Sequence, residues 1–155
     1  MSEKLDVVGI GNAMVDAIIP SNQSEIEKHE INRDSMNLID ENLKNNLHES
    51  YSIREMAGGG SLGNSMFGIT SFGGNGSFIG KIKNDEVGIF LQKDMVREGL
   101  QFPLGFTSPD ISTGCCTIFV EEDGTRTMCT FLGAGTLIGP DDINDQHIKN
   151  HKIAY

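Results

Sequence analysis

The chain has 155 residues, which suits one domain, and a formal net charge of −10 from 22 acidic and 12 basic residues. This balance disfavours a nucleic acid or an anionic membrane as a partner, because either would need a basic patch, and it leaves open a solvated acidic surface or an acidic docking face. Nothing in the sequence resembles a signal peptide, no apolar run approaches the ~20 residues of a membrane span, and no cysteine spacing is typical of a zinc site or a disulfide framework. We therefore expect a cytoplasmic protein without a metal site.

Two short strands joined by a tight turn are the first predicted elements. Residues 6–11 are an apolar run that ends in glycine, and residues 16–20 are a second apolar run closed by proline. Asn12 and Asp16 lie on the connection. The glycines of the first run are not a dinucleotide-binding fingerprint, because position 14 is methionine and a strand rather than a helix is expected next.

The following stretch predicts a helix, a strand and a second helix. Residues 21–31 read as a short polar helix and residues 36–39 as a strand. Asp40 then caps a helix that runs to about Glu49. The first of these helices has three possible capping residues, Ser21, Asn22 and Ser24.

A glycine cluster joined to a helix start, in residues 55–65, is the most informative stretch. Backbone that passes close to a ligand needs glycine, and Asn64 on the next helical turn can then bind the hydroxyl groups of that ligand. The cluster is not a phosphate-binding loop, since no Gly-Lys-Ser/Thr sequence ends it. Ser61 is the expected cap of the helix. The buried face of this helix is predicted to contain Leu62, Met66, Phe67, Ile69 and Phe72.

A strand and a helix are predicted again after the glycine-rich end of that helix. Residues 77–82 form the strand, Asp85 caps the helix, and Gly99 occupies the position of a C-terminal glycine cap. The apolar positions of this helix are Val87, Phe90, Leu91 and Met95. The order strand, helix, strand, helix therefore indicates an α/β sheet with parallel crossovers.

Residues 115–132 are rich in strand-forming residues and interrupt this alternation. Asp123 and Gly124 are a preferred pair for a two-residue hairpin turn, which would place Glu121 opposite Arg126. We expect this hairpin to be a flap rather than a member of a sheet. Arg126 then either closes over a ligand and neutralises phosphate charge or forms a surface ion pair with Glu121.

The last part of the chain predicts a helix and the opening of a strand. Residues 141–149 begin with two aspartates that can start the helix. Residues 152–155 are an apolar-leaning run that resembles the beginning of a buried strand. We therefore expect residues 1–155 to be the N-terminal part of a single, larger domain.

Asn12, Asp16 and Asn64 form the best candidate binding site. A polyol presents neighbouring hydroxyl groups that both donate and accept hydrogen bonds; a carboxylate can accept two of them, and an amide can do both. In the alternative interpretation, Asn12 is a turn residue, Asp16 a surface charge at a strand end and Asn64 an exposed helix residue. The spacing alone leaves both interpretations open.

Four motifs occur along the chain in a fixed order. They are Asp6-Val-Val-Gly-Ile-Gly-Asn12 with Asp16, Ala57-Gly-Gly-Gly-Ser-Leu-Gly-Asn64, Gly80-Lys-Ile-Lys-Asn-Asp85 with Gly88, and Asp123-Gly-Thr-Arg-Thr-Met128. Together they span nearly the whole chain, which resembles the N-terminal half of a PfkB (ribokinase-like) carbohydrate kinase, closest to the adenosine-kinase-like members.

The resemblance implies an α/β fold, namely a Rossmann-like, three-layer α/β/α ribokinase-like domain with a small β-sheet lid. It also implies transfer of the γ-phosphoryl group of ATP, with Mg²⁺, to a hydroxyl of a sugar or nucleoside. Asp16 is similar to the family's aspartate that holds substrate hydroxyls, and Gly59, Gly60 and Asn64 match the neighbouring glycine pair and asparagine. The lid, which would include Arg126, would consist of residues 36–39, 52–56 and 115–132.

The chain also departs from the family pattern. The family's catalytic base is the aspartate of a Gly-Ala-Gly-Asp motif, whereas Gly133-Ala-Gly135 is followed here by Thr136 and comes directly after the lid. We therefore assign no catalytic residue in this chain and expect no kinase activity from it alone. The alternative is a catalytically inactive sugar- or nucleoside-binding or interaction module. Its protein partner would be a complementary C-terminal half or, through the lid, a second copy.

Overall fold

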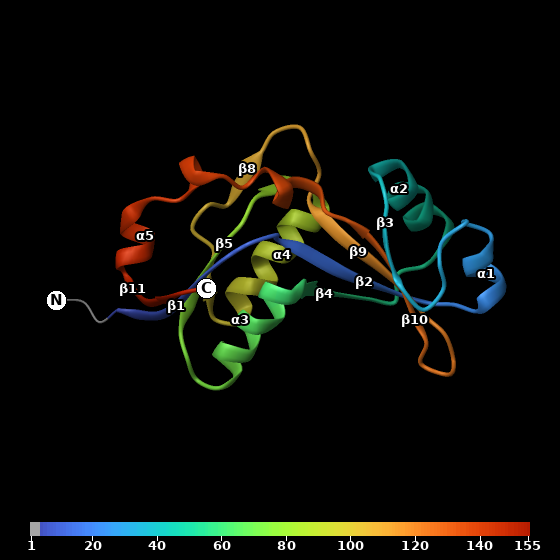
Figure 1. The fold of residues 1–155 in the computed structure, drawn as a ribbon, viewed down its shortest axis with the longest axis horizontal. Helices are drawn as coiled ribbons and strands as arrows, with labels where there is room; N and C mark the ends of the chain where they lie inside the picture. The colour runs from blue at the N-terminus through green and yellow to red at the C-terminus, as the bar shows by residue number, and fades with distance from the viewer. Residues whose placement is uncertain (1–3) are drawn as a thin grey trace.

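The computed structural model describes residues 4–155, which form two main sheets placed end to end along the long axis of the molecule (Figure 1). The four-stranded sheet is parallel, and its order is β11 (His151–Ala154), β1 (Leu5–Ile10), β5 (Gly76–Ile79) and β7 (Leu100–Gln101). The order of the five-stranded sheet is β3 (Met36–Leu38), β10 (Arg126–Phe131), β9 (Gly114–Val120), β2 (Met14–Pro20) and β4 (Glu55–Gly59). A separate two-stranded pair consists of β6 (Ile82–Lys83) and β8 (Phe106–Ser108).

Helices cover both faces of the four-stranded sheet, which confirms the predicted α/β architecture with parallel crossovers. A Cβ atom at Gly9 would contact Met66, so this face of β1 looks toward the helices α3 (Ser61–Ser71) and α4 (Glu86–Arg97). Ile10 points to the opposite face, because side chains alternate along a strand, and there it lines a groove with Pro140. The 3₁₀ segment η2 (Pro140–Asp142) and the helix α5 (Asp145–Lys149) lie on that second face (Figure 1). The preceding 3₁₀ segment η1 (Gly133–Leu137) contacts β9 and β6.

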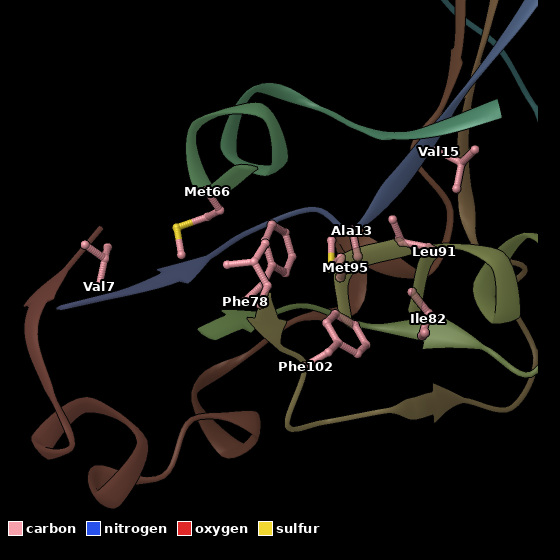
Figure 2. Close-up of a cluster of buried hydrophobic side chains, with 10 residues drawn as sticks. Val7, Ala13, Val15, Met66, Phe78, Ile82, Leu91, Met95 and Phe102 are labelled. Carbon is pink, nitrogen blue, oxygen red and sulfur yellow. The ribbon is translucent and has the colours of Figure 1, made fainter. Parts of the chain in front are cut away.

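The core of this part of the molecule lies between the sheet and the helices α3 and α4 (Figure 2). Met66 from α3 and Met95 from α4 are fully buried against Phe78 of β5. The rings of Phe78 and Phe102 stack with centroids 6.1 Å apart. Apolar residues at helical spacing in α4, bounded by the Asp85 cap, thus form the buried stripe that the sequence predicts.

The first two strands do not pair with each other, although only residues 11–13 separate them. β1 pairs with β5 and β11, whereas β2 continues into the five-stranded sheet between β4 and β9. Asp16 consequently lies inside a strand and not on the predicted connection. The predicted strand 77–82 is likewise divided, because the chain leaves the four-stranded sheet after Ile79 and pairs again as β6 with β8.

Two short helices cover one face of the five-stranded sheet. They are α1 (Gln23–Glu27) and α2 (Glu41–Ser50). Asp40 caps α2 as predicted, with its side chain accepting from the amide of Leu43. The first helix is shorter than the predicted 21–31, and Asn22 is the capping residue among the three possibilities, in a reciprocal capping box with Glu25. We call this helix-covered side of the sheet the covered face; its buried core contains Ile19, Ile26, Leu47, Phe119 and Cys129.

The helix α3 begins and ends differently from the prediction. Its N-cap is Gly60, which has φ +80° and gives no side-chain hydrogen bond, so Ser61 is the first helical residue and not the cap. Glycine is required here because the chain turns sharply from β4 into the helix through the left-handed region. Phe72 was expected on the buried face, but it follows the last helical residue and is 94% exposed.

The hairpin β9–β10 forms the middle of the five-stranded sheet, so the prediction of an isolated flap was wrong. Its register also differs by one residue from the prediction, since Arg126 lies opposite Val120. The loop has three residues, closed by a 3.0 Å bond from the amide of Glu121 to the carbonyl of Thr125. Gly124 has φ +86°, which is typical of a type I turn followed by a left-handed residue.

The C-terminal elements are of the predicted types, but their boundaries differ from the prediction. Gly99, with φ +86°, ends α4 as expected, and β11 begins at His151. The predicted helix 141–149 is divided into η2 and α5, whose cap is Asn144. Among residues 4–155, no helix is long and apolar enough to cross a membrane.

Candidate acceptor-binding site

The candidate site lies on the side of the five-stranded sheet that α1 and α2 leave uncovered, which we call the open face. Strand pairing assigns alternate residues of each strand to it. From β3 to β4 these residues are Met36 and Leu38; Arg126, Met128 and Thr130; Cys116, Ile118 and Val120; Met14, Asp16, Ile18 and Pro20; and Glu55, Ala57 and Gly59. Met36 and Leu38 at one edge are 55% and 65% exposed. The open face is therefore a largely apolar, partly exposed surface, with the carboxylate of Glu55 on the edge strand β4 and another carboxylate near its centre.

The central carboxylate belongs to Asp16, which is half-buried between β4 and β9. Burial raises its pKa above the ordinary value for aspartate. Its side chain makes no hydrogen bond or ion pair with any other residue in the range 4–155. A partly dehydrated carboxyl group with free acceptor positions is suited to binding hydroxyl groups of a ligand.

Gly59 lies directly against this carboxyl group. A Cβ atom at Gly59 would be 2.3 Å from the carboxyl carbon of Asp16, so no side chain fits between β4 and the acid. Gly59 pairs with Met14 across the ladder, two residues along from the pair formed by Asp16 and Ala57. The structure thus brings together two predicted site residues that come from separate motifs.

Gly60, Asn12 and Asn64 lie around the junction between the two sheets. A Cβ atom at Gly60 would be 3.0 Å from the Cγ of Met14 and 3.6 Å from the backbone oxygen of Asn12. The carbonyl of Gly60 accepts the amide of Asn64 at 2.9 Å, which places Asn64 on the first turn of α3, where its side chain is exposed. Neither asparagine side chain has a hydrogen-bond partner within residues 4–155.

Arg126 lies on the open face but far from Asp16. Arg126 is opposite Val120, and Asp16 is opposite Cys116. Val120 and Cys116 are four residues apart on β9, which corresponds to about 13 Å at the usual rise of a strand. The predicted ion pair with Glu121 does not form, because the register shift turns Glu121 toward Arg33, whose Nε lies 2.8 Å from the carboxylate. Arg126 is exposed and unpaired within the described range 4–155.

Sequence reasoning missed two interactions beside the site. Thr130 donates a hydrogen bond to the sulfur of Cys116 at 3.3 Å, next to Asp16 in the same row of the sheet. Asp94 of α4 accepts the amide of Gly58 at 2.8 Å. The signal for Asp94 was present, since it interrupts the apolar stripe of α4 beside a fully buried methionine.

The acidic, histidine and cysteine side chains of residues 4–155 form neither a metal cluster nor an activated thiol. Within residues 4–155, no three His, Cys, Asp or Glu side chains are arranged to hold a metal ion. Burial raises the pKa of Cys115 to about 12 and that of Cys129 to about 11, so neither thiol is a ready nucleophile. Gly133-Ala-Gly135 forms a 3₁₀ segment packed against the backbone of Asn12, not the start of a long helix.

Comparison with protein families gives a match along almost the entire chain. The model of the pfkB family carbohydrate kinases matches residues 5–155. "Probable fructokinase-4" of Arabidopsis thaliana is 29% identical over 104 residues, which cover 63% of this chain and 30% of the plant protein.

Solved structures show the same arrangement of the two sheets. An adenosine kinase from Sinorhizobium meliloti is 36% identical and superposes with a TM-score of 0.87, over 98% of this chain and 46% of that protein. A probable sugar kinase from Rhizobium etli CFN 42 is 31% identical with a TM-score of 0.86, over 99% of this chain and 46% of that protein. The fold is therefore ribokinase-like, and the chain spans less than half the length of these relatives.

Proposed function

Because this chain belongs to the pfkB family of carbohydrate kinases, we propose that it supplies the acceptor-binding and lid part of a kinase that phosphorylates a hydroxyl of a sugar or nucleoside. The observation that carries this proposal is the half-buried carboxyl group of Asp16, which has no partner within residues 4–155 and lies against Gly59, where no side chain would fit. The similarity to an adenosine kinase and to sugar kinases supports an acceptor of this class.

The site residues have distinct roles in this proposal. Asp16 accepts hydrogen bonds from neighbouring hydroxyl groups, and such charge-assisted bonds contribute roughly 1.5–3 kcal/mol each. Gly59 and Gly60 allow the ligand to approach the backbone, while Asn12 and Asn64 offer amide groups that donate and accept. The apolar residues of the open face exclude water from the bound acceptor, and Arg126 near the hairpin tip adds positive charge to the same face.

ATP and Mg²⁺ are the expected cosubstrate and metal of a kinase in this family, but the residues described here do not fit either group. The glycine cluster lacks a following Gly-Lys-Ser/Thr sequence, and no metal-binding cluster occurs in residues 4–155. We propose that the nucleotide and the general base are held outside this stretch. The 155-residue chain alone is then expected to bind an acceptor without phosphorylating it, since removing a general base typically costs 10²- to 10⁴-fold in rate.

Calorimetric titration of the chain with adenosine, ribose and fructose tests the proposal. We expect one of these acceptors to bind with an affinity that ATP does not change. Binding should be weakened about 10- to 100-fold in Asp16→Asn and kept in Gly68→Ala, a matched control whose new methyl group would meet nothing within 4 Å. Failure of all three acceptors to bind, or turnover with ATP at the rate of a complete kinase, would contradict the proposal.

A second candidate function, an interaction module, is favoured by the exposed edge of the four-stranded sheet. β11 is its outermost strand, and Ile153 and Tyr155 are 59% and 66% exposed there. We propose that a complementary C-terminal polypeptide adds to this edge, because unpaired strand edges recruit further strands. A homodimer through the exposed Leu38 on the open face is the competing arrangement.

Light scattering of two variants separates these arrangements. Ile153→Lys should weaken association with an added C-terminal half, and Leu38→Lys should leave that association intact. If Leu38→Lys alone changes the oligomeric state, the homodimer is correct and the edge proposal is wrong.

A further inference from the structure

We propose that Asp94 is a positioning residue for acceptor binding, which holds the glycine strand β4 in place against Asp16. This inference rests on the function proposed for the site. Asp94 lies on α4, outside the open face, and belongs to none of the motifs that pointed to the site.

The side chain of Asp94 is buried, with 6% exposure, and both of its oxygens are engaged. Oδ2 accepts the backbone amide of Gly58 at 2.8 Å, and Oδ1 is paired with the guanidinium of Arg97. β4 is the outermost strand of its sheet and pairs with β2 alone. The amide of Gly58 on this edge strand has no neighbouring strand to bond to, and the carboxylate of Asp94 supplies the acceptor in its place.

The surroundings of Gly58 leave little freedom for the strand to move. A Cβ atom at Gly58 would lie 2.6 Å from the Cζ of Phe67 and 3.0 Å from Oδ2 of Asp94. Phe67 belongs to α3 and Asp94 to α4, so both helices of the four-stranded sheet contact the end of β4. The strand β4 is thus fixed to the helices α3 and α4 at Gly58, the residue that precedes Gly59.

Only one peptide bond separates this anchor from the glycine that touches the candidate acid. A Cβ atom at Gly59 would lie only 2.3 Å from the carboxyl carbon of Asp16, so the space between this backbone and the acid is too small for a methyl group. A displacement of Gly58 must move Gly59 with it, because the peptide unit is rigid. The anchor at Asp94 therefore sets how deeply Asp16 is covered and how closely a ligand approaches the backbone.

Replacement of Asp94 tests this role with readouts that do not all require a ligand. Asp94→Leu keeps the branching at Cγ and removes both acceptor oxygens, whereas Asp94→Asn keeps an oxygen for Gly58. Arg97→Gln removes the ion pair and leaves the bond to Gly58. Leu100→Ala, in the edge strand β7 that packs against α4, is a control for general destabilisation. The measurements are amide exchange of Gly58, the titration of the Asp16 carboxyl by NMR, and calorimetric affinities for adenosine and fructose.

In Asp94→Leu we expect exchange at Gly58 to accelerate at least tenfold and acceptor affinity to fall about tenfold. The pKa of Asp16 should move down toward its ordinary value, because the carboxyl group becomes better hydrated. Asp94→Asn and Arg97→Gln should stay close to the wild type in all three measurements. Leu100→Ala should be less stable without a change at Asp16.

Two results would overturn the inference. One is an unchanged Asp16 titration and affinity in Asp94→Leu despite faster exchange at Gly58; the other is an equal change in Leu100→Ala. If Asp94→Leu does not fold, the same measurements are made on Asp94→Asn. Faster amide exchange at Gly58 in that variant, together with an unaltered Asp16 titration, would also exclude a positioning role for Asp94. If the wild type binds no acceptor, the proposed function fails, and Gly58 exchange with the Asp16 titration still decides the role of Asp94.

Discussion

The covered face and the open face of the five-stranded sheet are made by alternate residues of the same strands, yet they have different tasks. On the covered face, Ile19 and Phe119 are almost completely buried beneath α1 and α2. On the open face, Asp16 keeps unused hydrogen-bond acceptors, and the edge residue Leu38 is 65% exposed. Because side chains alternate along a strand, one segment can serve stability on one side and binding on the other. Substitutions on the two faces should therefore have separable effects.

The largest effect is expected from Phe119→Ala on the covered face. Phe119 is fully buried and its ring contacts Tyr51 edge-to-face with centroids 5.2 Å apart. Truncation should lower the free energy of unfolding by about 3–5 kcal/mol, as measured by urea denaturation. Met128→Ala on the open face is the matched control and should cost clearly less, because Met128 is only half-buried. Equal losses would remove the distinction between the faces.

The next largest effect is expected from Asp16→Asn, and it should concern binding. Loss of the charged acceptor should weaken acceptor affinity by about 10- to 100-fold in calorimetry, which corresponds to roughly 1.5–3 kcal/mol. Stability at neutral pH should rise at the same time, because burial disfavours the ionised carboxyl group in the folded state. A variant that binds normally would show that the open face does not carry the site.

The pH dependence of Asp16→Asn provides the internal check. The pKa of Asp16 is raised on folding, so its stabilising contribution is complete below the unfolded pKa and is lost as pH rises through the folded pKa. The stability advantage of Asp16→Asn should therefore shrink as the pH is lowered through that range. Acceptor binding by the wild type should weaken over the same range, since protonation removes the charged acceptor. A stability difference independent of pH would exclude this explanation.

A smaller effect is expected from Gly59→Ala, which should change both the stability of the fold and the affinity for the acceptor. The new methyl group would meet the Asp16 carboxyl at 2.3 Å, so the strand or the acid must move, at a cost of about 1–3 kcal/mol in unfolding free energy. Acceptor affinity should fall as well. The double variant Gly59→Ala/Asp16→Ala should recover stability and not binding. If it recovers neither, the contact between the two residues is not the cause.

The smallest effect is expected from Arg126→Ala at the tip of the open face. Arg126 is exposed and unpaired in the described range 4–155, so the free energy of unfolding should change by less than about 0.5 kcal/mol. Arg33→Ala, which breaks the pair with Glu121, should cost about 0.2–1 kcal/mol in the same urea experiment. A larger loss in Arg126→Ala than in Arg33→Ala would assign the arginine to the structure of the hairpin.

Local features of the fold could be predicted well from the sequence. The caps at Asp40 and Asp85 and the C-terminal glycine at Gly99 are confirmed. The reason is that a cap or a periodic apolar stripe depends on residues only a few positions apart. The hairpin register failed by one residue because Gly124 adopts the left-handed conformation in a three-residue loop, an alternative that the same Asp-Gly pair allows.

The sequence by itself indicated the family, the alternation of most strands and helices, and the candidate acid Asp16 through its motif. The short strands β7 and β8 were not predicted. Only the tertiary structure decided that β2 leaves the first sheet, that Gly59 lies against Asp16, and that Asp94 holds the preceding amide. Strand pairing and close packing join residues from distant parts of the chain. No single segment contains the information for such contacts, so the binding face exists only once the two sheets are assembled.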